Sequence, residues 1–153
     1  MGLFDSTEEH PPSKVLRYII TGVVFIVLIV LFAAYELRFH TEEKTIRYFM
    51  DAVVAGKMDE AFRIWKPAES YSFKDFLEDW GPDGYYGPIK SYHLEHMERL
   101  PDASGGASSG VVATIELSPY QPFPGDNDAA KQSKTKEVKI WVEFRNQSLG
   151  FPP

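Results

Sequence analysis

The pattern of apolar and polar residues changes sharply along this chain. Residues 15–35 form a nearly continuous apolar run, in which Arg17 is the single charged residue and Thr21 is the one clearly polar interior residue. At about 1.5 Å per helical residue the run reaches roughly 30 Å, the thickness of a bilayer hydrocarbon core. Because lipid offers no hydrogen-bond partners to the backbone, the run is predicted to be a transmembrane helix.

Residues that suit the membrane interfaces flank this run. Tyr18 and Tyr35 lie near its ends, where amphipathic rings favour the headgroup region. Arg17 at one end and Arg38 at the other have stems long enough to place their charges at the interface. We therefore expect a membrane anchor formed by these residues, with the lipid bilayer as its partner.

A cleaved signal peptide is the alternative interpretation of the run. Signal peptides have a shorter apolar region and a cleavage site of small residues, and Ala33-Ala34-Tyr35 is a poor match to such a site. The basic residues before and after the run nearly balance, but short N-terminal tails usually remain inside. The expected protein is a single-pass protein of a bacterial inner membrane, with a cytoplasmic N-terminus and a periplasmic C-terminal domain.

Apolar residues at helical spacing predict three short helices after the anchor. The first spans 41–55, either as a continuation of the membrane helix or as a restart capped by Thr41, and Gly56 suits the position just past its end. The second spans 58–65 and stops before Pro67. The third begins at Ser72, where Asp75 completes an approximate capping box, and ends at Trp80.

Alternating residues then predict three strands, at 89–100, 111–117 and 137–145. In the first, Met97 is expected on the face of His93, opposite Tyr92 and Leu94, and the strands are joined by polar loops at 102–110 and 118–136. Helices followed by an antiparallel meander indicate an α+β fold with helices on one face of a curved sheet. The expected divisions are a tail (1–14), a membrane helix (15–35), a connector (36–44) and a soluble domain (45–151).

The stretch 45–65, TIRYFMDAVVAGKMDEAFRIW, resembles the opening of NTF2-like (cystatin-like α+β cone) domains. Those domains begin with an amphipathic helix, a turn of glycine and a charged residue, and a second helix that contains alanine and an aromatic residue. Gly56-Lys57, Ala61 and Trp65 occupy these places here. The resemblance implies a half-cone of strands around an interior pocket, although three strands are fewer than such domains usually have. The superfamily includes both enzymes and non-catalytic modules, so the resemblance assigns no functional residue.

The composition of the chain argues against several classes of function. The formal net charge is −6, which gives no electrostatic support to nucleic-acid binding. There is no cysteine, so disulfides, thiol catalysis and cysteine metal sites are excluded. Aromatic residues make up 14 % of the chain, enough for a dense core.

His93-Leu94-Glu95-His96 is the main candidate for chemistry. A zinc peptidase needs two histidines at helical spacing, whereas a strand would point His93 and His96 to opposite faces and leave His93 and Glu95 able to pair. A pocket acid/base pair drawn from His93, Glu95 and Asp75 is the enzymatic alternative, of the lyase, isomerase or hydrolase type, and a small-ligand site is related to it. The ordinary interpretation is solvated surface residues, so the sequence predicts no enzyme, cofactor or metal.

Aromatic residues beside prolines are more suggestive of protein recognition. They are Tyr85, Tyr86, Tyr120, Phe123 and Phe151. Proline lowers the cost of ordering a loop and aromatic rings supply contact area, although such rings also pack onto a domain's own core. The expected function is that of an accessory or assembly subunit, whose soluble domain contacts other subunits of a membrane complex, for example a respiratory or photosynthetic one.

Overall fold

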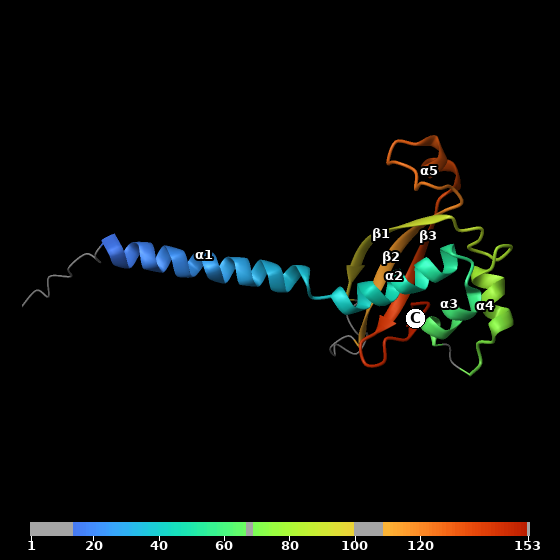
Figure 1. Cartoon of the computed structure of the whole chain (residues 1–153), viewed down its shortest axis with the longest axis horizontal. Coiled ribbons are helices and arrows are strands. Elements are labelled where there is room, and N and C mark those ends of the chain that lie inside the picture. Colours follow the sequence, from blue (N-terminus) through green and yellow to red (C-terminus); the bar gives the residue numbers. More distant parts are fainter. Residues whose placement is uncertain (1–13, 67–68, 100–108, 153) are drawn as a thin grey trace, which may run out of the picture. The chain divides into compact units, whose positions relative to one another are not determined.

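A computed structural model describes residues 14–66, 69–99 and 109–152. The chain divides into two units, Met1–Arg38 and Phe39–Pro153. The first unit contains the helix α1 (Lys14–Glu36), and the second contains the remaining helices and a sheet (Figure 1). The protein is therefore an α+β protein with a long N-terminal helix, as the pattern predicted.

The helix α1 is long and apolar enough to cross a membrane, and none of its most apolar window is buried in the protein. The Thr21 hydroxyl donates to the carbonyl oxygen of Arg17 at 2.9 Å, so its polar group is satisfied within the helix. At the other end, the Arg38 guanidinium lies 4.0 Å from the centre of the Tyr35 ring and donates to its hydroxyl at 3.2 Å. Two of the residues expected at an interface thus interact directly.

The next helix, α2 (His40–Val54), is a restart, because α1 ends at Glu36. The prediction of Thr41 as its cap is wrong: Phe39 occupies the N-cap position, and no side chain caps the helix there. Phe39 is buried in the core of the second unit, so packing of this ring fixes the start of α2. At its other end Gly56 adopts a φ of +73°, as expected for the residue past a helix end.

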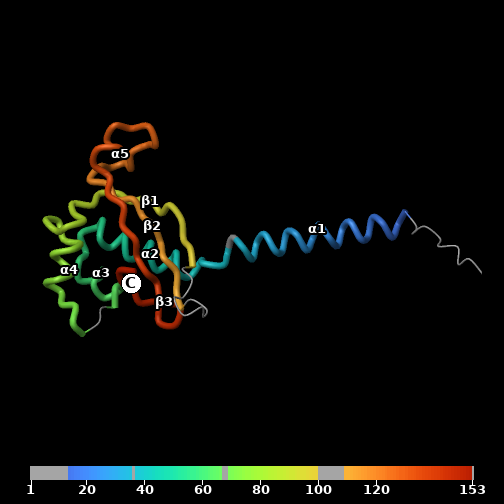
Figure 2. The backbone as a smooth tube through the Cα atoms, turned by 180° about the vertical axis from the view of Figure 1, so that it is seen from behind, coloured from blue at the N-terminus to red at the C-terminus, as the bar shows by residue number. Residues whose placement is uncertain are grey.

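Two short helices follow, α3 (Met58–Trp65) and α4 (Phe73–Trp80). Four antiparallel strands then form one open sheet in the order β1-β2-β3-β4, with bounds Ser91–Glu98, Gly110–Ser118, Lys136–Glu143 and Leu149–Gly150. The helix α2 lies against one face of this sheet, and Figure 2 shows the strands from the other side. The sequence missed β4, which has only two residues.

The sheet and the helices enclose an aromatic core. The buried residues of β3 are Val138, Ile140 and Val142, as the alternation predicted. The same core contains Phe49, whose ring centroid lies 5.0 Å from those of Trp65 and Trp80. These rings form part of the hydrophobic core.

Strand β1 corrects the predicted alternation. A bulge between Leu94 and His96 inserts one residue and shifts the phase of the side chains. As a result Met97 packs against the core with Tyr92 and Leu94 instead of lying with His93. His93 and His96 are both exposed, so the expected opposite orientation is also wrong. Leu100, the predicted end of the strand, lies outside the described residues.

The connection between β2 and β3 is not a simple loop. It contains the short helix α5 (Ala129–Lys134), which stands at one end of the sheet (Figure 1). Lys131 of this helix forms ion pairs with Glu116 of β2 at 3.0 Å and with Asp126 at 2.9 Å. These pairs attach the connection to the strand that precedes it.

Candidate functional site

A pocket of about 300 Å³ lies where the turn after α4, the end of β2 and the α5 connection meet. We call it the lysine pocket; its lining includes Tyr86, Pro88, Leu117, Ser118, Lys134 and Lys136. Its lining combines the apolar residues Pro88, Leu117 and Pro119 with two lysines, two serines and Tyr86. This mixture of apolar walls and a few polar groups is typical of binding sites.

The turn that carries Tyr85 and Tyr86 is held by the end of α4. The backbone N–H of Tyr85 donates to Glu78 at 2.8 Å, and that of Tyr86 donates to Asp79 at 2.9 Å, in both cases to the carbonyl oxygen. A Cβ atom on Gly87 would lie 2.1 Å from the carbonyl oxygen of Gly81, so only glycine fits there. The two tyrosines are therefore presented by a rigid turn.

Aromatic residues from distant segments meet at this turn. The ring of Tyr86 stacks on Trp80 with centroids 4.9 Å apart, and Phe151 from the C-terminal segment lies 6.0 Å from Tyr86. Tyr85 contacts Tyr86 edge to face at 4.9 Å. The exposed fractions are 71 % for Tyr85 and 41 % for Phe151, so both offer surface to a partner.

The two lysines connect the pocket to these rings. The Lys136 ammonium donates to the carbonyl oxygen of Tyr85 at 2.6 Å and lies 5.4 Å from its ring centre. The Lys134 ammonium lies 5.7 Å from the ring centre of Tyr120, which adds this residue to the group. We call Tyr85, Tyr86, Tyr120 and Phe151 the aromatic rim. Tyr86 lines the lysine pocket, and each of the other three contacts Tyr86 or a lining lysine. Phe123 lies elsewhere, 5.7 Å from the His93 ring.

Hydrogen bonds fix the backbone at the floor of the pocket. The Tyr120 N–H donates to the hydroxyl oxygen of Ser118 at 3.0 Å, and the Ser91 hydroxyl donates to the Tyr120 carbonyl at 2.5 Å. Burial raises the pKa of the Tyr86 phenol, with smaller contributions from Tyr85 and Asp79. The Tyr86 hydroxyl is therefore neutral at physiological pH, and the site's positive charge comes from its lysines.

The three candidates for catalysis are not brought together. His93 and Glu95 pair as expected, with Nε2 and Oε1 3.9 Å apart, on the exposed side of β1. Asp75 instead accepts hydrogen bonds from the Ser72 N–H at 2.8 Å and the Ser72 hydroxyl at 2.7 Å, and this capping box lowers its pKa. None of these side chains lines the lysine pocket or the groove described next.

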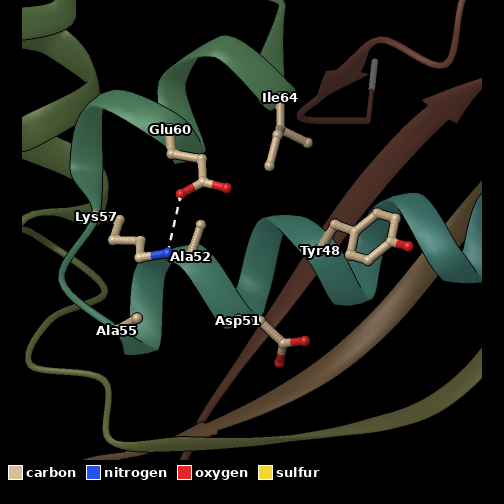
Figure 3. Close-up of a pocket in the computed structure, with 7 residues that line it drawn as sticks. All are labelled: Tyr48, Asp51, Ala52, Ala55, Lys57, Glu60 and Ile64. Carbon is tan, nitrogen blue, oxygen red and sulfur yellow. Dashed lines mark ion pairs between the residues drawn. The ribbon is translucent and has the colours of Figure 1, made fainter.

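Sequence reasoning missed a groove between α2 and α3. It consists of two adjoining pockets of about 500 and 350 Å³ that share Tyr48, Glu60 and Ile64. Figure 3 shows the larger pocket, with Tyr48 at one end and the Lys57–Glu60 ion pair, 3.3 Å long, at the other. An exposed tyrosine off the apolar stripe of α2 was the signal available in the sequence.

Comparison with known proteins places the chain in no group. No family model matches it, and neither curated proteins nor solved structures give a significant match. Across the described residues, no group of three His, Asp or Glu side chains is arranged to hold a metal ion. The site is thus defined by its own geometry, in an α+β domain that follows a helix of membrane-spanning length.

Proposed function

We propose that this protein is a single-pass, membrane-anchored accessory or assembly subunit whose soluble, NTF2-like domain binds other proteins of a larger membrane complex. One observation carries the proposal. Four of the five aromatic residues expected to contact partners, from three separate segments, are linked by contacts to the lining of one pocket. Tyr86 lines it, Tyr85 and Phe151 lie against Tyr86, and Tyr120 lies beside the lining residue Lys134. Tyr85 and Phe151 are exposed, and clustered exposed aromatic rings are typical of protein interfaces.

The rigidity of the rim supports protein binding. Tyr86 is held by α4 and stacked on Trp80, and Phe151 stacks on the same indole. Rings that are already ordered lose little side-chain entropy when a partner binds, so more of the contact energy remains as affinity. A respiratory or photosynthetic complex would supply such partners in a bacterial inner membrane.

The packing of the interior supports a non-enzymatic role. In a cone-shaped domain that acts on a small molecule, the interior would be open. Here Phe62 lies 5.4 Å from Phe76, and Trp65 lies 5.5 Å from Trp80, so rings occupy the space between the helices. The His93 and Glu95 side chains are both exposed, so water has access to this pair.

The exposure of α1 supports the anchor. Its apolar side chains are exposed in the protein along their whole length, a burial pattern that fits a helix surrounded by lipid. On this proposal residues 1–14 are cytoplasmic and the domain is periplasmic. The transmembrane helix then holds the domain at the membrane surface, and the aromatic rim provides recognition.

Site-specific photo-crosslinking in native membranes tests the proposal. A photoreactive phenylalanine analogue replaces Tyr85 in the full-length protein, and a second protein carries it at Tyr48, which is also an exposed tyrosine but lies in the α2–α3 groove. We expect discrete crosslinks to another protein from position 85 and not from position 48. Absence of crosslinks at both positions, together with migration as a lone monomer in mild detergent, would overturn the proposal.

A further inference from the structure

We propose that the lysine pocket binds the side-chain carboxylate of an acidic residue in a partner protein. On this proposal the carboxylate lies between Lys134 and Lys136, and apolar neighbours of the acidic residue contact Tyr85 and Phe151. The inference rests on the proposed partner-binding function and adds to it the chemistry of the partner. Two features of the pocket support it: its charge and its apolar walls.

The charge of the pocket is opposite to that of the whole chain. The net charge is −6, yet in the described part of the protein no carboxylate lies within 4 Å of the Lys134 or Lys136 ammonium. Glu116 at the end of β2 and Asp126 before α5 are both paired with Lys131, and these contacts raise the pKa of that lysine. The two pocket lysines are therefore left to attract a carboxylate from another molecule.

Ser118 holds the backbone beside this pair of charges. It is fully buried, and its hydroxyl oxygen accepts from the Tyr120 N–H at 3.0 Å. The donors offered to a ligand are therefore the two ammonium groups, which suit a carboxylate because it has two acceptor oxygens and no donor.

The walls of the pocket favour a carboxylate on an apolar stem over a phosphate group. Leu117, Pro88 and the Tyr86 ring form these walls, and a pocket of about 300 Å³ accepts the methylene groups of a glutamate side chain. No arginine lines it, although arginine gives the bidentate geometry that suits phosphate. In the α2–α3 groove, by contrast, Lys57 is already paired with Glu60.

A pair of matched peptides tests the inference. Full-length, ¹⁵N-labelled protein in neutral-lipid nanodiscs is titrated with acetyl-Leu-Glu-Pro-amide and with acetyl-Leu-Gln-Pro-amide, which differ only in the charged group. We expect saturable shifts of the Ser118, Lys134 and Lys136 amide signals with the glutamate peptide, and at least about fivefold weaker binding of the glutamine peptide. Equal binding of the two peptides, no binding of either, or tighter binding of inorganic phosphate than of the glutamate peptide would each overturn the inference.

Lysine variants provide the matched control. Lys134→Gln and Lys136→Gln should each weaken binding of the glutamate peptide roughly two- to fivefold, the range expected for exposed charges. Lys139→Gln makes the same change of charge on an exposed lysine that does not line the pocket, and it should leave binding unchanged. Equal loss with Lys139→Gln would show only a nonspecific charge effect and would contradict the inference.

Crosslinking separates this inference from the proposed function. If the partner crosslink from position 85 keeps its full yield in the Lys134→Gln/Lys136→Gln variant, the carboxylate contact is wrong while partner binding stands. If position 85 gives no crosslink although the pocket discriminates the two peptides, the pocket chemistry stands and the subunit role is wrong. A yield that falls in the double lysine variant and not in Lys139→Gln supports both.

Discussion

The rings of Trp80 and Phe151 are stacked, with centroids 6.2 Å apart and planes only 3° apart. Trp80 is the last residue of α4, and Phe151 follows directly after β4. Trp80 also contacts Tyr86 and Phe49, so a single indole joins the aromatic rim to the core. The proposed recognition surface therefore depends on the packing of the C-terminal segment.

Phe151→Ala should lower the free energy of unfolding by about 1–2 kcal/mol, because the ring is partly exposed and a fully buried Phe costs about 3–5 kcal/mol. The measurement is urea unfolding of the full chain in mild detergent, followed by near-ultraviolet circular dichroism. Tyr85→Ala is the control: this ring is 71 % exposed, so the loss should stay within about 0.5 kcal/mol. An equal loss in both variants would show that the stack has no special role.

The periodic segments were predictable because each of them satisfies its pattern locally. The stripe of Ile46, Phe49 and Met50 predicts a helix, and all three residues are buried. The alternation in β3 predicts a strand in the same way. The two short elements α5 and β4 were missed, since six and two residues are too few to show a period. The sequence left open whether α2 continues the membrane helix or starts as a separate helix. No glycine or proline marks a break near Phe39, where α2 starts in the structure.

The site was predictable only as separate parts. The sequence identified Tyr85, Tyr120 and Phe151 as aromatics beside prolines, but not that contacts with Tyr86 and Lys134 would link them to one pocket. That arrangement depends on the sheet order and on the stacking around Trp80, which are long-range features. The bulge in β1 escaped prediction for a similar reason, since its position is set by pairing with β2.

Ser72→Ala should destabilise the domain by about 1 kcal/mol, because it removes the side chain that accepts from the Asp75 N–H at 3.2 Å. Thermal unfolding of the full chain measures the loss. Hydrogen bonds from Ser72 hold the pKa of Asp75 below its usual value of 3.8, so the stabilisation from this carboxylate is present above that pH and is lost as the pH falls.

Asp75→Asn distinguishes this structural role from a catalytic one. The variant should show a smaller loss of stability than the wild-type protein when the pH falls below about 4, since the titrating group is gone. The peptide binding of the lysine pocket should be unchanged in it, because Asp75 does not line that pocket. An unaltered acid profile would contradict the assigned role of the capping box.

Tyr92 should make stability depend on pH in the alkaline range. Burial, and then the hydrogen bond from its hydroxyl to Asp51 at 2.9 Å, raises the pKa of Tyr92 from 10.0 to about 12. Because the folded pKa is the higher one, this contribution to stability is complete below pH 10 and is lost as the pH rises towards 12. Unfolding of the wild-type protein and Tyr92→Phe across this range should show a steeper decline for the wild type.

Asp51→Asn tests the cause of that shift. The pKa of Tyr92 should move part of the way back towards 10, because the charged acceptor is lost while burial remains. Tyrosinate absorbance is measured against pH for Asp51→Asn and for the double variant Asp51→Asn/Tyr92→Phe. The difference between the two titration curves gives the pKa of Tyr92. If the pKa of Tyr92 does not change in Asp51→Asn, then burial alone causes the shift.

Charged residues in α1 should release the protein from the membrane. A lysine near the centre of a transmembrane helix carries an apparent insertion cost of about 2.5–3.5 kcal/mol, so Leu28→Lys/Phe32→Lys should move much of the full chain into the alkaline carbonate supernatant. Leu37→Lys lies past the end of α1 and should leave the protein in the pellet. Mass spectrometry of the wild-type protein in the pellet should also recover peptides from residues 1–35. Their absence would instead indicate cleavage after a signal sequence, and the helix would then have no role in holding the domain at the membrane.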